Sequence, residues 1–380
     1  MDKLKLMIIV GTRPEIIRLS EVIKKCDEYF DLTLVHTGQN YDYNLNGIFF
    51  KELGLRDPDY YLEAVGKDLG ETIGNIIAKS YELMVKTKPE AVLVLGDTNS
   101  CLSVIGAKRL HIPTFHMEAG NRCFDECLPE ETNRRIVDII SDLNMCYSEH
   151  ARRYLNASGV AKERTYVTGS PMAEVLNAHI DSIRSSDILE RLNLKKNGYI
   201  LLSAHREENI DTDENFYSLF NAINSMAKTY DVPVLYSCHP RSAKKIKEKN
   251  FKLDERVIMH EPLGFYDYNK LQMNALAVVS DSGTLPEESS YYLSIGNPLA
   301  SVAIRTSTER PEAMDKGNFI LSGISEREVL RSVEMAIAMK NNNDLGIPVP
   351  DYLDLNVSLK VVKLIESYTG IINRMVWRKQ

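Results

Sequence analysis

The stretch LKLMIIVGTRPEIIRLSEVI, residues 4–23, decides the fold class of this chain. Residues 4–10 form a short, mostly apolar run, which is typical of a strand buried on both faces of a parallel sheet. Gly11 then opens a turn, and apolar side chains recur with helical spacing after Pro14, a residue that suits the first turn of a helix. The stretch therefore predicts a strand, a tight turn and a helix.

The same strand–turn–helix pattern recurs along the chain, which predicts parallel sheets with right-handed crossovers. The expected strands are residues 4–10, 32–36, 91–95, 112–117, 143–147, 165–167, 199–202, 233–237, 258–262, 276–279 and 298–304. After the first helix, the expected helices are residues 69–85, 104–110, 129–140, 149–158, 214–228 and 359–372.

The length of 380 residues suits two domains, and the Gly-Ser-Pro segment at 169–171 is typical of a hinge. We expect an N-terminal Rossmann-like domain, residues 1–169, which the C-terminal helix 359–380 joins, and a C-terminal Rossmann-like domain, residues 170–358. The fold class is thus α/β with two doubly wound domains whose polar strand ends face a cleft. This architecture resembles the glycosyltransferase B type.

The composition is that of a globular protein, with 44% apolar and 26% charged residues. The sequence has no apolar run long enough to span a membrane, and its N-terminus lacks the features of a signal peptide, so we expect a cytoplasmic protein without a membrane partner. The net charge of −7 argues against a nucleic-acid binder.

The six cysteines are scattered, which indicates free thiols in a reducing compartment. Cys123 and Cys127 lie four residues apart and are either two free thiols or half of a zinc site. Further zinc ligands at matching spacing are missing from the sequence. The Asp-x-Asp pairs at 57–59 and 211–213 do not directly end a buried strand and are expected in loops or helix caps. We therefore expect no metal.

Two polar residues stand next to predicted strands in the N-terminal half. Arg13 lies at the start of the first helix, where backbone N–H groups, the helix dipole and a guanidinium together suit an anion; a plain turn with a surface arginine is the alternative. Asp97 follows the strand 91–95, at the edge where open α/β sheets bind ligands. It either contacts a ligand or caps the helix that follows.

Carboxylates and arginines concentrate in HMEAGNRCFDECLPEETNRRIVD, residues 116–138. Glu118 directly follows a predicted strand, and charged residues gathered at the end of a buried strand are typical of a functional site. Glu130 lies in the first turn of the helix that begins at Pro129. There it either takes part in chemistry or stabilises the helix through the macrodipole and an ion pair with Arg134.

In the C-terminal half, His205 and Arg206 follow the predicted strand 199–202. A lone histidine is more often structural, but an arginine and two glutamates beside it favour a functional role. Tyr268 lies in an aromatic segment that is suited either to stacking on a flat ring or to the core.

A second candidate for phosphate binding follows the strand 276–279. Ser282 and Gly283 form a small-residue turn before a helix start, which predicts a phosphate cradle. Glu288, in the first turn of that helix, is placed to accept hydrogen bonds from ribose hydroxyls.

Seven short motifs follow one another along nearly the whole chain. They are Gly-Thr-Arg-Pro-Glu at 11–15, Gly-Asp-Thr at 96–98, Glu-Ala-Gly at 118–120, Pro-Glu-Glu-x-Asn-Arg at 129–134, His-Arg-Glu at 205–207, Asp-Ser-Gly at 281–283 and Thr-Glu-Arg-Pro-Glu at 308–312. Each motif alone is a weak signal, whereas seven in order are a strong one. Together they closely resemble the non-hydrolysing bacterial UDP-N-acetylglucosamine 2-epimerase family.

The resemblance implies a mechanism without a cofactor, in a homodimer, with a UDP-binding C-terminal domain. A carboxylate removes the C2 proton of the sugar while UDP leaves C1; UDP then adds back to the 2-acetamidoglycal with protonation from the other face. It implies that the acid–base residues are Asp97, Glu118, Glu130 and His205. It also implies that the substrate-binding residues are Arg13, Arg18, Arg134, Arg206, Tyr268, Ser282, Gly283, Glu288 and Arg310.

Three departures from the family pattern favour one branch. The segment 121–128 contains an Asn-Arg-Cys-Phe-Asp-Glu run that the usual enzymes lack, Gly-Thr-Leu-Pro at 283–286 replaces Gly-Gly-Ile-Gln, and Arg18 replaces a lysine. With the ending 373–379, these features resemble the capsule and O-antigen enzymes that convert UDP-2-acetamido-2,6-dideoxy-L-talose to UDP-N-acetyl-L-fucosamine. We hypothesise that 121–128 shapes the sugar pocket.

Three other interpretations remain open from the sequence. An ordinary epimerase of UDP-N-acetylglucosamine and UDP-N-acetylmannosamine is the first. A glycosyltransferase on the same fold and a regulatory protein that binds a nucleotide sugar are the others. Carboxylates at three separate strand or helix ends exceed what binding a neutral sugar requires, which argues against the regulatory protein. Solvent deuterium at C2 of the sugar would distinguish an epimerase from the last two.

Overall fold

The computed structural model describes residues 2–38, 43–204, 212–238, 240–260 and 263–379. The chain divides into two compact units, unit 1 (Met1–Ala178 with Asp354–Gln380) and unit 2 (His179–Leu353). The chain passes into unit 2 inside helix α7 (Met172–Ser185), later than the segment 169–171 at which we expected the hinge. The reason is local: Glu174 accepts hydrogen bonds from the backbone N–H of Ser358, at 2.8 Å, and from its hydroxyl, so the first half of α7 is fixed to the C-terminal helix.

Unit 1 is built on a parallel sheet with the strand order β3-β2-β1-β4-β5-β6-β7. The order runs outward from β1 in both directions, which is the signature of a doubly wound sheet. The strands are β1 (Lys5–Val10), β2 (Asp31–His36), β3 (Tyr60–Tyr61), β4 (Ala91–Leu95), β5 (Thr114–Met117), β6 (Leu143–Cys146) and β7 (Thr165–Val167).

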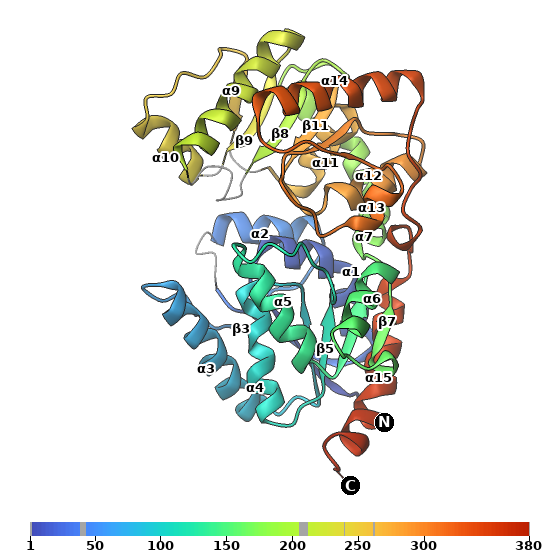
Figure 1. Ribbon diagram of the computed structural model, residues 1–380. Helices are drawn as coiled ribbons and strands as arrows, with labels where there is room; N and C mark the ends of the chain where they lie inside the picture. Colours follow the sequence, from blue (N-terminus) through green and yellow to red (C-terminus); the bar gives the residue numbers. More distant parts are fainter. Residues whose placement is uncertain (1, 39–42, 205–211, 239, 261–262, 380) are drawn as a thin grey trace. The chain divides into compact units, whose positions relative to one another are not determined.

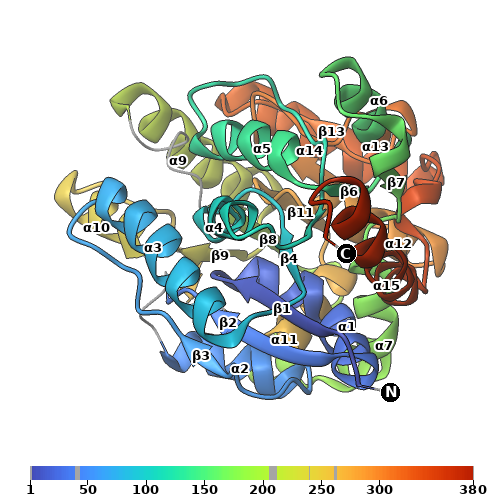
Figure 2. The same cartoon turned by 90° about the horizontal axis from the view of Figure 1, so that it is seen from below.

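Helices cover both faces of this sheet (Figures 1 and 2). On one face, α3 (Leu69–Thr87), α4 (Val104–Arg109) and α5 (Pro129–Ile140) pack against the sheet, with Met84, Val104 and Val137 in one core with side chains of β1 and β4. On the other, α15 (Val357–Met375) returns from the C-terminus to pack on α1 (Arg13–Tyr29). The remaining helices of unit 1 are α2 (Tyr43–Glu52), α6 (Glu149–Ala157) and the first part of α7.

Unit 2 repeats the architecture with the strand order β10-β9-β8-β11-β12-β13. Helices α9 (Asp213–Tyr230) and α14 (Glu326–Asn342) pack together on one face, where Phe216 and Phe220 share one apolar core with Val329 and Val333. Its strands are β8 (Ile200–Ala204), β9 (Val234–Cys238), β10 (Val257–His260), β11 (Ala277–Ser280), β12 (Ser301–Ala303) and β13 (Ile320–Leu321). Its helices are α8 (Ile188–Arg191), α9 (Asp213–Tyr230), α10 (Pro240–Glu248), α11 (Phe265–Asn274), α12 (Leu285–Ser294), α13 (Pro311–Asp315) and α14 (Glu326–Asn342).

The predicted α/β class with two Rossmann-like doubly wound sheets is confirmed. Helix α14 is an element that the sequence analysis missed, although Ser325 and Glu328 form the reciprocal capping pair that marks a helix start. No helix among the described residues combines the length and the apolar character that a membrane span requires.

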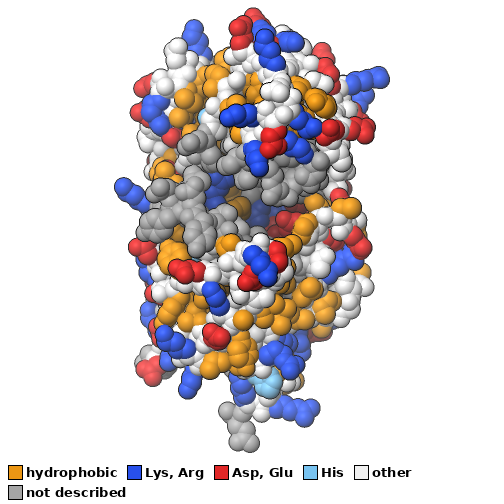
Figure 3. Space-filling view, turned by 90° about the vertical axis from the view of Figure 1, so that its left-hand side faces the viewer, with side chains coloured by type: hydrophobic (Ala, Val, Ile, Leu, Met, Phe, Trp, Pro, Cys, Tyr) orange, Lys and Arg blue, Asp and Glu red, His pale blue; other side chains and the backbone are white. Residues whose placement is uncertain are grey.

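Apolar side chains also remain exposed on unit 1. Figure 3 looks onto the side of the molecule that carries α3 and shows hydrophobic side chains gathered over its lower part, which belongs to unit 1. Exposed apolar residues on α3 and α5 include Leu69, Tyr81, Val85, Ile136 and Ile139.

Candidate active site

The polar residues of unit 1 meet where β1, β4 and β5 end. These three strands are neighbours, and the winding of the sheet reverses between β1 and β4. In open α/β sheets such a switch point at the carboxyl ends of the strands is where ligands bind. Because the strands are parallel, the turns that follow them lie at one edge and bring Arg13, Asp97 and Glu118 to the same edge of the sheet.

Glu118 directly follows β5 and is 6% exposed. Its backbone has a φ of +64°, a left-handed conformation that is uncommon for a residue with a side chain and is held by its surroundings. One carboxylate oxygen, Oε2, forms an ion pair with Arg18 of α1, and Oε1 accepts a hydrogen bond from the amide of Asn121 at 3.2 Å. An arginine 100 residues earlier in the sequence and an amide three residues later therefore fix the direction of this carboxylate.

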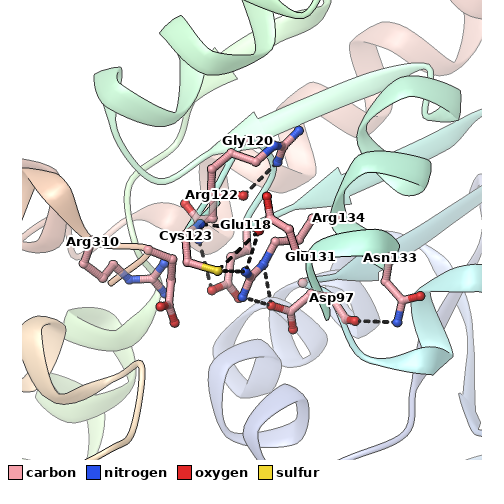
Figure 4. Close-up of polar contacts among 12 residues, drawn as sticks. Asp97, Glu118, Gly120, Arg122, Cys123, Glu131, Asn133, Arg134 and Arg310 are labelled. Atoms are coloured by element: carbon pink, nitrogen blue, oxygen red, sulfur yellow. Dashed lines mark hydrogen bonds and ion pairs between the residues drawn. The ribbon is translucent and has the colours of Figure 1, made fainter. Parts of the chain in front are cut away.

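Asp97 is held by Arg134 (Figure 4). The guanidinium donates to Oδ2 of Asp97 from Nε at 2.8 Å and from Nη2 at 2.5 Å. Asn133, the preceding residue on α5, donates to the backbone carbonyl of Asp97 at 2.9 Å. The N-cap positions of the 3₁₀ helix 99–103 and of α4 are Thr98 and Ser103, so the alternative in which Asp97 caps a following helix is wrong.

The first turn of α5 presents two glutamates with different environments. Glu131 is 1% exposed, and its Oε2 accepts hydrogen bonds from Arg134 at 3.1 Å and from the backbone N–H of Cys123 at 3.4 Å. Glu130 is half-buried. Glu131, three residues earlier on α5, therefore holds Arg134 in addition to Asp97.

Glu15 joins the turn after β1 to the turn after β4. Its Oε2 accepts hydrogen bonds from the hydroxyls of Thr12 and Thr98 at 2.7 and 3.0 Å and from the backbone N–H of Gly11 at 3.1 Å, and Oε1 accepts from the hydroxyl of Ser100. Burial raises the pKa of Glu15, although these donors act in the opposite direction. The buried carboxyl fixes the two turns to each other.

Sequence analysis did not single out Glu15, Glu131 or Asn133, although all three belong to motifs that it quoted. Arg13 was predicted, and its guanidinium lies 5.4 Å from the centre of the Phe49 ring, at the N-terminal end of α1. The position is compatible with the predicted anion site, because the first N–H groups of a helix have no partner within the helix.

Segment 121–128 divides into an inner and an outer part. Asn121 and Arg122 are buried and donate hydrogen bonds to Glu118 and Asp138, respectively, within unit 1. Phe124, in contrast, is 63% exposed, and its ring meets the edge of Tyr154 at a centroid distance of 5.3 Å. The exposed or half-buried part of the segment is therefore residues 123–127.

In unit 2 the predicted phosphate cradle lies between β11 and α12. The hydroxyls of Ser282 and Thr284 are 2.9 Å apart, and Thr284 donates to Oε1 of Glu288 at 2.8 Å. Gln272 of α11 donates to the other oxygen, Oε2, at 2.6 Å. Tyr268, half-buried, lies one turn before Gln272 on the same side of α11.

Arg310 is fully buried, unlike a side chain that lines an open surface. It donates from Nε at 3.0 Å and from Nη2 at 2.6 Å to one oxygen of Glu287, which is also fully buried on α12. Gly283, the remaining predicted residue of unit 2, lies in the turn before α12. His205 and Arg206 lie outside the described residues. Across the part of the chain that the structure describes, His, Cys, Asp and Glu side chains do not gather in threes as metal ligands would.

The site of unit 1 thus presents two carboxylates at adjacent strand ends, each oriented by its own arginine. Such a pair can remove a proton from a bound ligand and return one to it. A family model for UDP-N-acetylglucosamine 2-epimerase matches residues 24–366. The chain belongs to this epimerase family. It is therefore an isomerase, as the motifs had predicted.

Solved structures and curated relatives agree with the assignment to the epimerase family. The structure of a UDP-N-acetylglucosamine 2-epimerase from Rickettsia bellii is 45% identical, with a TM-score of 0.90 over 99% of this chain and 100% of that one. The enzyme from Methanocaldococcus jannaschii, solved with UDP-GlcNAc and UDP, is 30% identical, with a TM-score of 0.88 over 96% and 100%. A UDP-2,3-diacetamido-2,3-dideoxy-D-glucuronate 2-epimerase from Pseudomonas aeruginosa is 31% identical over 90% of this chain and 94% of its own.

Proposed function

We propose that this enzyme inverts C2 of a UDP-2-acetamido sugar by eliminating UDP to a 2-acetamidoglycal and adding it back. The observation that carries the proposal is the pair of carboxylates, Asp97 and Glu118, at the ends of adjacent strands. The C2 proton is not acidic, so the reaction needs a base on one face of C2 and a proton donor on the other. Two carboxylates from separate strand ends can approach a ring from two sides.

The arginines beside these carboxylates position them. Arg18 holds Glu118, and Arg134 holds Asp97 through two hydrogen bonds, which fixes the direction of each proton-transferring oxygen. Glu130, half-buried at the start of α5, would be the third acid–base group, and His205 the fourth.

We place the nucleotide-binding residues as follows. In unit 2, the turn at Ser282 and Gly283, followed by the N-terminus of α12, would hold the diphosphate, and Arg206 would meet its charge. In unit 1, Arg13 would bind an anionic group at the start of α1. Tyr268 would stack on the uracil and Glu288 would accept from the ribose hydroxyls. Arg310 would act through Glu287, because its guanidinium is fully buried against that carboxylate at the start of α12.

For the sugar, we propose UDP-2-acetamido-2,6-dideoxy-L-talose, converted to UDP-N-acetyl-L-fucosamine for capsule or O-antigen synthesis. The support is the unusual segment 121–128, whose outer part exposes an aromatic ring at Phe124. An apolar ring there would suit the methyl group of a 6-deoxy sugar. The relative from Pseudomonas aeruginosa, which has a different sugar in its name, is an example of the variety of sugars within the family.

UDP-N-acetylglucosamine is the second candidate substrate. It is favoured by the 45% identity and full-length match to the enzyme from Rickettsia bellii, which bears the name of that activity.

The test is to incubate the enzyme with each UDP-sugar in deuterated water and to follow C2 by NMR. We expect deuterium at C2, the C2 epimer and traces of free UDP with the L-talose derivative. Exchange only with UDP-N-acetylglucosamine would select the second candidate. Absence of exchange with every 2-acetamido sugar would overturn the proposed reaction.

A variant pair makes this assay specific for the site. Glu118→Gln should reduce the exchange rate by roughly 10²- to 10⁴-fold, the range for loss of a general base. Glu149→Gln is the matched control, because Glu149 also pairs with an arginine, Arg152, but on the exposed surface of α6. An equal loss in both variants would remove Glu118 from the proposed chemistry.

The segment hypothesis has its own test. Replacing residues 123–127 by the corresponding segment of a UDP-N-acetylglucosamine enzyme, with Asn121 and Arg122 retained, should shift the ratio of kcat/KM between the two sugars. An unchanged ratio would show that these residues do not select the sugar.

We further propose a cytoplasmic homodimer that uses the exposed apolar side chains of α3 and α5. Val85→Asp should then convert the dimer to a monomer in light scattering after size exclusion. Ile347→Asp, at an exposed apolar position of unit 2, is the control and should leave the dimer intact. A wild-type monomer would contradict the proposal.

A further inference from the structure

A buried cluster of charged side chains, His116, Asp138 and Arg122, lies next to the turns that carry the proposed carboxylates. His116 of β5 places Nδ1 at 3.0 Å from Oδ1 of Asp138 on α5, and both side chains are almost completely buried. Arg122 donates to Oδ2 of the same carboxylate at 2.6 Å. The cluster thus joins a strand, a helix and the segment 121–128 through one carboxylate, and none of its members is among the predicted acid–base or substrate-binding residues.

The geometry determines the protonation of His116. Its Nε2 lies 2.8 Å from the backbone carbonyl of Gly96, and a carbonyl oxygen can only accept, so Nε2 must carry a proton. A neutral ring would then leave the lone pair of Nδ1 beside the carboxylate of Asp138. The imidazolium, with protons on both nitrogens, donates to the Gly96 carbonyl through Nε2 and forms an ion pair with Asp138 through Nδ1. The arrangement therefore fits a buried cation.

The surroundings agree with this assignment. Burial, the largest single influence, lowers the pKa of His116, but Asp138, the Gly96 carbonyl and Glu118 together outweigh it and raise the pKa above its ordinary 6.5. The strand neighbours of His116 in register are uncharged, namely Val94 on β4 and Asn144 on β6.

Two other groups near the cluster stay neutral. Burial raises the pKa values of the Cys101 and Cys146 thiols, and Asp138 acts on both in the same direction. The charged groups that face the ring are therefore Asp138 and Glu118, with Arg122 on the far side of the Asp138 carboxylate.

The cluster holds the backbone on which both proposed catalytic carboxylates stand. Gly96, whose carbonyl accepts from His116, immediately precedes Asp97. On the other side, Asp138 accepts from the backbone N–H of Gly120 at 3.1 and 3.2 Å, two residues after Glu118. The His116 ring thus holds the turn after β4, and its counter-ion Asp138 holds the turn after β5.

We propose that His116 is a positioning residue, an imidazolium held by Asp138 that fixes Asp97 and Glu118 relative to each other. The role assigned to these carboxylates rests on the proposed function. Loss of the charge of the ring removes the ion pair with Asp138, and loss of the Nε2 proton also frees the turn that carries Asp97. The turnover number then falls at alkaline pH, whereas substrate affinity, which depends on other residues, changes little.

Asp138→Asn is the decisive variant, because it keeps the shape of the side chain and removes the charge that holds the imidazolium. We expect kcat to fall by roughly 10- to 100-fold, the scale of a displacement of about 1 Å at the site, with KM nearly unchanged. The alkaline limb of the kcat–pH profile should move to lower pH. A folded variant with the wild-type profile would overturn the proposal.

The chain offers a closely matched control in Asp142→Asn. Asp142 is as fully buried as Asp138, lies four residues later and likewise holds a cation, Lys108, and a backbone N–H, that of Thr114 at 3.0 Å. It precedes β6 and therefore lies at the amino edge of the sheet, away from the proposed site. It should lower stability but leave kcat and its pH profile unchanged. Equal kinetic effects in both variants would overturn the proposal.

A measurement on the wild-type protein tests the imidazolium without substrate. With ¹⁵N-labelled histidine, and His116→Gln to assign the resonances, both ring nitrogens of His116 should be protonated at pH 7.5, well above the usual histidine range of about 6.5. A singly protonated ring at that pH would overturn the proposal even if Asp138→Asn failed to fold. Because no substrate is present, this result is independent of whether the proposed epimerisation is correct.

Discussion

Gly96 leaves the space that the Glu118 carboxylate occupies. A β-carbon on Gly96 would lie 3.2 Å from Oε2 of Glu118, the oxygen that pairs with Arg18, and Gly96 itself has a φ of +74°. The absence of a side chain after β4 is thus a condition for the conformation of the carboxylate after β5. A proposed catalytic group and a glycine that is 22 residues earlier in the sequence depend on each other.

Gly96→Ala should therefore lower activity beyond its effect on stability. Alanine at a positive φ costs roughly 1 kcal/mol whatever the space, and here it also presses on Glu118. Gly159→Ala is the control, because Gly159 has a φ of +87° with open space around its β-carbon position. Urea unfolding should show similar losses in both variants, whereas kcat should fall only in Gly96→Ala; a fall in both would assign the effect to strain.

Arg134→Lys should impair turnover although it keeps the charge. Lysine lacks the planar fork that donates twice to Asp97, so the carboxylate would lose its fixed direction, and we expect kcat to fall by about 10- to 100-fold. Arg135→Lys, one residue later on the same helix, changes a half-exposed arginine that pairs with Glu126 at the surface and should be neutral. Full activity of Arg134→Lys would show that charge alone suffices.

Glu15 makes stability depend on pH. Its pKa is raised in the folded protein, so the folded state binds the proton more tightly than the unfolded state. The stability of the protein therefore falls as the pH rises from the pKa of Glu15 in the unfolded state through its pKa in the folded state. Glu15→Gln removes this loss, so the variant should gain in stability relative to wild type between pH 4.5 and pH 8. Urea midpoints at several pH values measure it, with Glu82→Gln on the exposed face of α3 as control. A pH-independent difference would contradict the assignment.

Breaking the buried ion pair between Arg310 and Glu287 should lower the stability of the protein more than breaking a half-exposed ion pair of unit 2. Arg310→Ala leaves a fully buried carboxylate without this cation, a change that typically costs about 3–5 kcal/mol. Arg191→Ala removes a half-exposed arginine that pairs with Asp187 and Asp267 and should cost less than about 1 kcal/mol. Urea unfolding measures the loss of stability in each variant. Equal losses would show that the burial of Arg310 does not increase the contribution of its ion pair to stability.

Much of the fold could be predicted from local patterns. Apolar runs of strand length and helical periodicities identify the alternating units, and alternation with right-handed crossovers leads to doubly wound sheets. The same reasoning placed Asp97 and Glu118 at one edge of a sheet, because both directly follow strands. The domain boundary was less predictable, since the first half of α7 belongs to unit 1 through a contact with Ser358, which is distant in sequence.

The partners of the charged residues were not predictable in the same way. Periodicity indicates that Glu130, Glu131 and Arg134 share the first turns of one helix, but not which side of that helix meets the sheet. Packing of α5 against its neighbours buries Glu131, directs Arg134 at Asp97 and leaves Glu130 half-buried. The same holds for Asp97, which the sequence offered equally as a helix cap.

The sequence by itself thus determined the alternation of strands and helices, the family and the strand-end positions of the carboxylates, because these follow from local spacing and from short motifs. The tertiary structure alone decided which groups are buried and which charge meets which. His116 and Asp138 are 22 residues apart, and their contact exists only because β5 and α5 pack together. The ion pair with Asp138, the Gly96 carbonyl and Glu118 together outweigh the effect of burial and turn an ordinary histidine into a candidate cation beside the site.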